Sequence, residues 1–209
     1  MAQPIWRFCC LQDFEVKIIL ATQNQGKLKE FQQLSKGKGF EFIAIPPGLE
    51  EMPEETGNTF KENALIKAKH VSEYFQMPAL ADDSGLEVDA LNGEPGIYSA
   101  RYSASGSDVD NCKKLLSNMK DVAKENRTAR FKCCLLGFYN GSSVFAEGSL
   151  EGEIAEEFKG DKGFGYDPIF IVPKYNLHLA EMEKEEKNKI SHRYKAFKAI
   201  SKTLSSLIN

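Results

Sequence analysis

A short segment near the N-terminus has the residue types that hold phosphate. The segment Thr22–Lys27 (TQNQGK) lies between an apolar, β-branched run at residues 16–21 and a helical pattern that begins near Leu28. A strand-to-helix turn offers backbone N–H groups, the positive end of a helix dipole and, through Lys27, a cation. The same composition is typical of a plain turn, so this segment alone leaves both interpretations open. It is not a Walker A loop, because Leu28 follows Lys27 where Ser or Thr would stand.

Two adjacent carboxylates, Asp82 and Asp83, directly follow the apolar run at residues 79–81. At the end of a buried strand they would repel each other and lose hydration, for which a hard divalent cation is the natural compensation. The alternative is that one aspartate caps the turn while the other is solvated. The glutamates at positions 50, 51, 54 and 55, taken by themselves, are typical of a solvated loop.

Cations gather in the segment 187–193 (KNKISHR) near the C-terminus. Ser191 suits a helix N-cap, which would place His192 and Arg193 in the first helical turn. Cations in that turn oppose the helix dipole, and such a conflict is expected mainly where function requires it. Phe164 stands between two glycines, a context that suits a base-stacking platform, although a core aromatic beside a bend fits the same stretch.

The elements that must position these groups alternate between strands and helices in the first half of the chain. We expect strands at residues 16–21, 40–45, 79–81 and 169–172, and helices that begin near Leu28, Thr59, Ser107 and Arg193. Thr59 and Glu62 have the spacing of a capping box. Asn140-Gly141, between apolar runs at residues 129–139 and 143–150, is a strong β-hairpin signal. This order predicts an α/β fold with a mixed sheet.

Length and charge narrow the class of protein. The 209 residues fit one domain or a compact pair of lobes. A formal net charge of −3 argues against a protein that binds nucleic-acid polymers, which takes an excess of Lys and Arg, but it allows small anions. No apolar stretch reaches the ~20 residues that a membrane-spanning helix needs. Arg7 interrupts the apolar run near the N-terminus, which makes this segment a poor secretory signal, and we expect residues 1–15 to be an N-terminal extension. The five cysteines form no C-x-x-C pair, so we expect idle thiols and a cytoplasmic protein.

Five segments, in this order and at this spacing, resemble the inosine triphosphate pyrophosphatase family, and its bacterial branch in particular: LATQNQGKLKEF, EETGNTFKENALIKA, ADDSGLEVDALNGEPGIYSARYS, FGYDPIF and KNKISHR. The resemblance covers about residues 16–207. It implies an elongated mixed β-sheet flanked by helices, with residues 16–209 forming a single two-lobed catalytic domain around a central cleft. It also implies a homodimer that hydrolyses noncanonical purine nucleoside triphosphates (ITP, dITP and XTP) to the monophosphate and pyrophosphate, with Mg²⁺ as cofactor.

The resemblance also implies roles for single residues. Asp83 matches the base that activates the attacking water, and Glu54 and Asp83 match the metal-binding positions. Phe164 would stack on the purine, whose edge Asp167, His192 and Arg193 would read. The full set of implied substrate-binding residues is Thr22, Gln23, Asn24, Gln25, Gly26, Lys27, Lys67, Ser84, Phe164, Gly165, Tyr166, Asp167, Lys187, His192 and Arg193.

One departure from the family pattern bears on specificity. Tyr194 stands where many members have Gly after His-Arg, so it could alter the base pocket and the ranking of substrates. Two alternatives to the leading hypothesis are a nucleotide-binding sensor without turnover and a pyrophosphatase that acts on altered pyrimidines or methylated bases. The sensor would require Lys27, Phe164 and Arg193 but no intact acidic residues.

Overall fold

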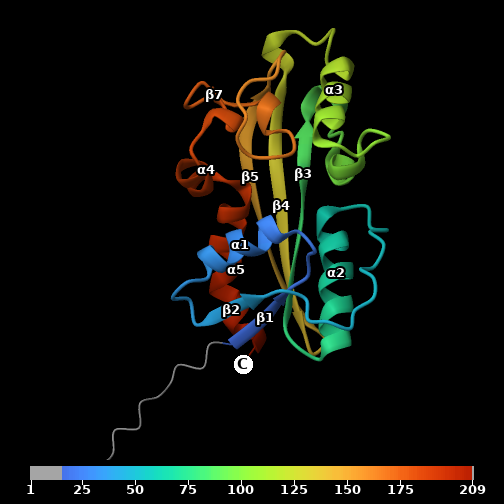
Figure 1. The fold of residues 1–209 in the computed structure, drawn as a ribbon, viewed down its shortest axis with the longest axis vertical. Helices are drawn as coiled ribbons and strands as arrows, with labels where there is room; N and C mark the ends of the chain where they lie inside the picture. Colours follow the sequence, from blue (N-terminus) through green and yellow to red (C-terminus); the bar gives the residue numbers. More distant parts are fainter. Residues whose placement is uncertain (1–15, 209) are drawn as a thin grey trace, which may run out of the picture.

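The computed structural model describes residues 16–208, so the predicted N-terminal extension lies outside the described residues. Seven strands form one sheet in the order β2-β1-β3-β4-β5-β6-β7 (Figure 1). The strands are β1 (Val16–Leu20), β2 (Phe40–Ile43), β3 (Ala79–Val88), β4 (Thr128–Tyr139), β5 (Ser142–Ile154), β6 (Phe170–Val172) and β7 (Leu177–His178). The strand β1 pairs in parallel with β2 and β3, and all later pairs are antiparallel. The mixed sheet predicted from the sequence is therefore confirmed.

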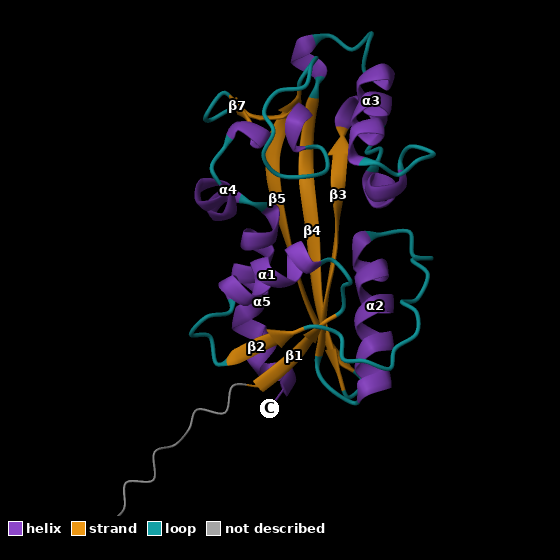
Figure 2. Cartoon of the chain, in the orientation of Figure 1, coloured by secondary structure: helices purple, strands orange, loops and turns teal. Residues whose placement is uncertain are grey.

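The long strands β3, β4 and β5 run along the length of the molecule, and helices cover both faces of the sheet (Figures 1 and 2). The α-helices are α1 (Gln25–Leu34), α2 (Phe60–Phe75), α3 (Asp108–Asn118), α4 (Lys184–Ile190) and α5 (His192–Ile208), and the 3₁₀ turns include η1 (Asp89–Leu91) and η2 (Gly96–Arg101). Helix α2 packs on β3 and β4, and α5 packs on the other face of β4 and β5. Among residues 16–208, none of the helices combines the length and apolar character needed to cross a bilayer.

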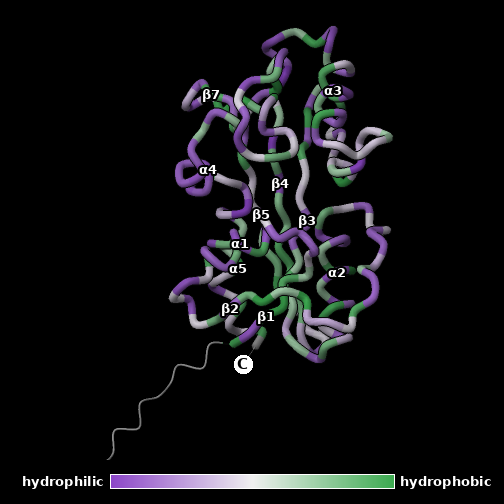
Figure 3. Tube along the Cα trace, viewed as in Figure 1, coloured by the Kyte–Doolittle hydropathy of each residue, from purple (hydrophilic) through white to green (hydrophobic). Residues whose placement is uncertain are grey.

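Hydrophobic residues are frequent along the strands and recur within the helices (Figure 3). One buried cluster joins β1, β2, α1 and α5, and a second lies between α2 and the sheet. A third cluster joins α3 and β6 to the other ends of β3, β4 and β5. Cys112, Cys133 and Cys134 are free and buried, as expected for structural thiols. The division into two lobes stays a prediction.

The strand β3 is longer than the sequence pattern predicts. The expectation of a strand at residues 79–81 followed by an acidic turn is wrong, because β4 pairs with β3 without interruption from Ala79 to Val88. Side chains alternate between the two faces of a strand, so Asp82 and Asp83 point to opposite faces of the sheet. Meanwhile β1 pairs with β3 only as far as Leu80. Beyond that point β3 has no strand neighbour on this edge until its bridge at Glu87, within the described residues.

The predicted hairpin turn is confirmed, and the predicted capping box is half right. Asn140 and Gly141 adopt left-handed conformations (φ of 47° and 77°) in the tight turn between β4 and β5. The Thr59 hydroxyl caps α2 by accepting from the Glu62 N–H group. The reciprocal bond of a capping box is replaced, because the Glu62 carboxylate accepts from the Asn58 N–H group instead of that of Thr59. The acidic loop is thereby tied to the start of α2.

The start of α5 lies against β5, where Gly148 makes room for it. A Cβ atom at Gly148 would overlap the His192 carbonyl oxygen and the Ala196 nitrogen. The predicted cap is confirmed, since the Ser191 hydroxyl accepts from the Tyr194 N–H group at 3.0 Å. The close approach of backbone to backbone fixes where the first turn of α5 presents its side chains.

We predict that Gly148→Ala lowers the free energy of unfolding by about 1–3 kcal/mol, because the added methyl group must push α5 away from β5. Urea unfolding followed by circular dichroism measures this change. Ser143→Ala, on an exposed position of the same strand, is the matched control and should change stability by less than about 0.5 kcal/mol. Equal stability of the two variants would contradict this account of α5 packing.

Candidate active site

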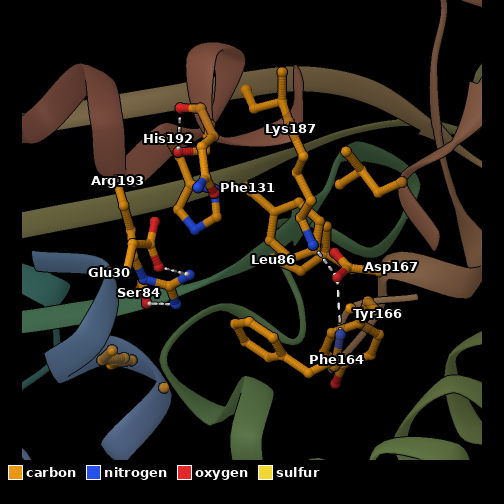
Figure 4. Close-up of a pocket in the computed structure, with 18 of the residues that line it drawn as sticks. Glu30, Ser84, Leu86, Phe131, Phe164, Tyr166, Asp167, Lys187, His192 and Arg193 are labelled. Atoms are coloured by element: carbon orange, nitrogen blue, oxygen red, sulfur yellow. Dashed lines mark hydrogen bonds and ion pairs between the residues drawn. The ribbon is translucent and has the colours of Figure 1, made fainter. Parts of the chain in front are cut away.

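A cavity of about 630 Å³ opens between α1, the middle of β3 and the segments around Phe164 and α4–α5 (Figure 4). This volume lies within the usual range for sites that bind small molecules. It brings together most of the residues predicted to bind substrate: Thr22, Asn24, Gly26, Lys27, Ser84, Phe164, Gly165, Tyr166, Asp167, Lys187, His192 and Arg193. Glu54, Lys67 and Asp83 do not line it, and neither do Gln23 and Gln25, whose side chains are exposed.

The predicted phosphate turn forms as a capped helix start. The Asn24 side chain accepts from the N–H groups of Gly26 (2.8 Å) and Lys27 (3.1 Å), and Thr22 accepts from Asn24. The expectation that these N–H groups are free is therefore wrong for Gly26 and Lys27, because the cap satisfies them. The cation of this turn is still available to bind phosphate, because the partly exposed Lys27 side chain lines the cavity.

Asp82 lies on the same face of the sheet as this turn and holds two cations. Its side chain is completely buried, and its Oδ2 atom accepts from the Arg193 Nε atom at 2.8 Å. Its Oδ1 atom lies 3.3 Å from the Lys27 ammonium nitrogen. Burial alone would raise the pKa of Asp82, but Lys27 and Arg193 hold that pKa well below its ordinary value. The carboxylate is thus charged and neutralised within the protein.

Asp83, on the opposite face, belongs to a separate ionic cluster with Lys67 and Glu55. The Lys67 ammonium group donates to Asp83 Oδ1 (2.8 Å), Glu55 Oε1 (2.7 Å) and the main-chain oxygen of Asp82 (3.0 Å). Burial raises the pKa of Asp83, although Lys67 opposes the shift. Burial also acts to raise the pKa of Glu55, but hydrogen bonds from Lys67 and Arg101 bring it below its ordinary value.

These two clusters correct the first interpretation of the acidic residues. The expectation that Asp82 and Asp83 share one cation at the end of a strand is wrong, because strand alternation separates them and each has its own counter-ions. The glutamate that meets Lys67 is Glu55. The Glu54 side chain is exposed and makes no hydrogen bond or ion pair with any residue that the structure describes.

The oxygen atoms around Lys67 suit a small divalent cation. Two carboxylates and a main-chain carbonyl group already surround one positive charge there. Magnesium prefers such hard oxygen ligands and commonly takes only one or two carboxylates, completing its shell with water and substrate phosphates. No group of three or more Asp, Glu, His or Cys side chains with metal-site geometry occurs within residues 16–208. The donor set fits magnesium with substrate better than a closed structural metal site.

The other end of the cavity carries an exposed aromatic ring. Phe164 is 53% exposed, which excludes the core-aromatic interpretation, and both Lys187 and Arg193 lie 5.4 Å from its ring centre. Asp167 supports this arrangement, because its Oδ2 atom accepts from the Phe164 N–H group (2.9 Å) and from the Lys187 ammonium group. The neighbouring Gly165 N–H group donates to Asp108. These contacts hold the ring at the mouth of the cavity.

His192 forms part of the cavity wall as a neutral ring. It stacks on Phe131 with ring centres 5.1 Å apart and an interplanar angle of 12°. Its Nδ1 atom is buried without a hydrogen-bond partner among the described residues. Burial and the nearby Arg193 hold the pKa of His192 well below its ordinary value. An imidazole in this environment is uncharged at neutral pH.

Sequence reasoning missed two residues of this region and misjudged a third. Glu30 lines the cavity, with its carboxylate 4.0 Å from Arg193, and its position one helical turn after Lys27 was the available signal. Glu55 was assigned only to a solvated loop. Tyr194, expected to alter the base pocket, does not line the cavity. Tyr166 lines it but is a core residue, whose hydroxyl group donates to the Ser99 carbonyl oxygen.

We predict that His192 makes the protein less stable in mild acid. Its folded-state pKa lies below the unfolded value, so the unfolded chain binds the extra proton and stability falls as the pH drops below about 6.5, by up to about 1.4 kcal/mol per pH unit. Urea unfolding of the wild type and His192→Gln between pH 8 and pH 5 measures the slope. The variant should lose this part of the slope, and an unchanged slope would show that His192 is not buried in the neutral form.

Solved structures of known proteins share this architecture. The HAM1 protein from Coxiella burnetii is 40% identical, with a TM-score of 0.83 over 91% of this chain and 99% of that chain. The Ham1 protein from Staphylococcus aureus is 40% identical, with a TM-score of 0.81 over 91% of this chain and 98% of that chain. These matches confirm the elongated mixed sheet flanked by helices.

Sequence comparisons agree with the structural ones. A dITP/XTP pyrophosphatase from Desulforamulus reducens is 49% identical over 92% of this chain and 97% of its own length. The enzyme of the same name from Bacillus subtilis is 47% identical over 90% of this chain and 96% of its own length. A model of the Ham1 family matches residues 18–203. The resemblance found in the five motifs is thus confirmed, and the chain belongs to the Ham1 family.

Proposed function

We propose that this protein hydrolyses deaminated purine nucleoside triphosphates, such as dITP, ITP and XTP, to the monophosphate and pyrophosphate. One observation carries the proposal: a single cavity joins the Lys27 turn to Phe164 and Arg193, beside the open edge of β3 that bears Asp83. A nucleotide laid along it would have phosphates at one end and its base at the other. The activity named for the similar proteins from D. reducens and B. subtilis supports the same conclusion.

The base end of the cavity suits a purine with an oxygen at C6. Phe164 offers a ring face for stacking. Arg193 donates one hydrogen bond from Nε to Asp82 and one from Nη2 to the Ser84 hydroxyl group. Three of its five N–H groups are therefore left to donate to a ligand. A 6-oxo group accepts from such a donor. A 6-amino group would leave it unpaired in a desolvated site, and mismatches of this kind give large discrimination.

The phosphate end suits hydrolysis of the bond between the α- and β-phosphates. Lys27 supplies positive charge for the triphosphate. Lys67, beside Asp83, and Lys187, at the base end, would be further nucleotide contacts, as the family resemblance indicates. Asp83 would take a proton from the attacking water, and burial favours this role by bringing its pKa closer to neutral. Asp83 and Glu55 would hold magnesium, with Glu54 as the alternative that the family resemblance indicates. Bound magnesium neutralises phosphate charge and lowers the pKa of a bound water.

The homodimer and the cytoplasmic location are also proposals. The dimer rests on the family resemblance, and the location on the pattern of cysteines. Sedimentation velocity on the purified protein distinguishes a dimer from a monomer.

We predict that the wild type releases pyrophosphate from dITP with magnesium at least ~100-fold more efficiently, in kcat/KM, than from dATP, and that Asp83→Asn lowers kcat for dITP by roughly 100-fold or more. Pyrophosphate release coupled to a phosphate assay measures both. Equal rates on dITP and dATP would contradict the base selectivity. If Asp83→Asn hydrolysed dITP as fast as the wild type, Asp83 would not be the catalytic base. If the wild type bound dITP tightly without hydrolysing it, the alternative of a nucleotide-binding sensor would be favoured.

The neighbouring glutamates provide a matched pair for the metal site. We predict that Glu55→Gln raises the magnesium concentration for half-maximal activity by roughly tenfold, whereas Glu54→Gln leaves it close to that of the wild type, because only Glu55 meets the Lys67–Asp83 cluster. Binding of Mn²⁺ without nucleotide, followed by electron paramagnetic resonance, gives a readout independent of turnover. The reverse order of the two variants would assign the metal ligand to Glu54.

A further inference from the structure

Asp82 is a buried carboxylate whose two counter-ions, Lys27 and Arg193, line the cavity. Its side chain has no exposed surface, and both of its oxygen atoms face cations. Those cations come from distant parts of the chain, Lys27 from α1 and Arg193 from the first turn of α5. A charge buried at this depth is costly unless paired, so the two cations and the carboxylate stabilise one another.

Arg193 depends on Asp82 for its direction. The Arg193 Nε atom donates to Asp82 at 2.8 Å and Nη2 donates to the Ser84 hydroxyl group at 3.0 Å. Glu30, the other nearby carboxylate, lies 4.0 Å from Nη1, beyond hydrogen-bond distance. Asp82 therefore supplies the only charged hydrogen bond that orients this guanidinium group within the described residues. The positive helix end beside Arg193 does not favour the cation, which makes the carboxylate more necessary.

The same carboxylate also pairs with the cation at the phosphate end of the cavity. Its Oδ1 atom lies 3.3 Å from the Lys27 ammonium nitrogen. The Lys27 and Arg193 side chains would repel each other without the anion between them. Asp82 is thus placed to hold the phosphate-binding cation and the base-reading cation at a fixed separation.

We propose that Asp82 is a positioning residue that sets the selectivity for the base by holding Arg193 and that also steadies Lys27. This inference rests on the proposed function, in which Arg193 reads the 6-oxo group. It gives the two aspartates separate roles: Asp83 acts on the phosphates from one face of β3, and Asp82 acts through Arg193 and Lys27 from the other. Neither oxygen of Asp82 needs to touch the substrate.

The test is the ratio of kcat/KM for dITP to that for dATP in purified Asp82→Asn. The variant keeps the shape of the side chain but removes its charge. The ratio should fall by roughly tenfold or more, because Arg193 is no longer held toward the 6-oxo group. KM should rise for both substrates, because Lys27 is loosened as well. A residue needed only for folding would lower both kcat/KM values alike and leave the ratio unchanged.

Two further variants keep the test decisive if Asp82→Asn alone folds poorly. Lys27→Met should weaken binding of both substrates alike and preserve the ratio, because in the proposed function Lys27 would contact the phosphates and not the base. Lys27→Met/Asp82→Asn removes one cation and one anion, so the buried charges stay balanced, and its ratio should fall to that of Asp82→Asn. Asp89→Asn, which breaks an exposed ion pair with Arg130, is the matched control and should keep the wild-type ratio.

A double-variant cycle shows whether Asp82 acts through Arg193. Arg193→Met should abolish the selectivity, and adding Asp82→Asn should then change the ratio no further. If the effects of Arg193→Met and Asp82→Asn on the ratio were independent and multiplied in the double variant, the proposal would be contradicted. A wild-type ratio in both Asp82→Asn and Lys27→Met/Asp82→Asn would also contradict it. Absence of hydrolysis or selectivity in the wild type would instead overturn the proposed function itself.

Discussion

The alternation of side chains along β3 organises the whole site. Because neighbouring residues of a strand face opposite ways, two adjacent carboxylates enter two separate ionic clusters instead of one. Lys27 and Arg193 neutralise Asp82 on the α5 side, and Lys67 neutralises Asp83 on the α2 side. Each charge is acceptable in the interior only because helices on both faces deliver these cations.

The strand order explains why both clusters can serve one ligand. Since β1 stops pairing at Leu80, the edge of β3 is open beside Asp82 and Asp83. A phosphate chain that reaches this edge has access to groups on both faces of the sheet. The early end of β1 is therefore as important to the site as the side chains are, while β4 pairs with the other edge of β3 along its whole length.

Much of the site could be predicted from the sequence, because its residues fall in motifs with local signatures. The strand-to-helix turn before α1, the Ser191 cap and the hairpin at Asn140-Gly141 depend on neighbouring residues, and all three are present, although the Asn24 cap of that turn was not predicted. The length of β3 could not be predicted, because polar residues end the apolar pattern while their counter-ions lie far away in the sequence. The choice between Glu54 and Glu55 depends on how the loop is tied to α2, which no periodic pattern encodes.

The central claim is that one cavity receives the base at Phe164 and Arg193 and the phosphates at Lys27, from where they reach the edge of β3 that bears Asp83. A crystal structure with magnesium and a dITP analogue carrying a nonhydrolysable α–β linkage tests it most directly. The account predicts the purine stacked on Phe164, its 6-oxo group within hydrogen-bond distance of Arg193, and the phosphates at the open edge of β3. A nucleotide bound with its base turned away from Arg193, or outside this cavity, would contradict it.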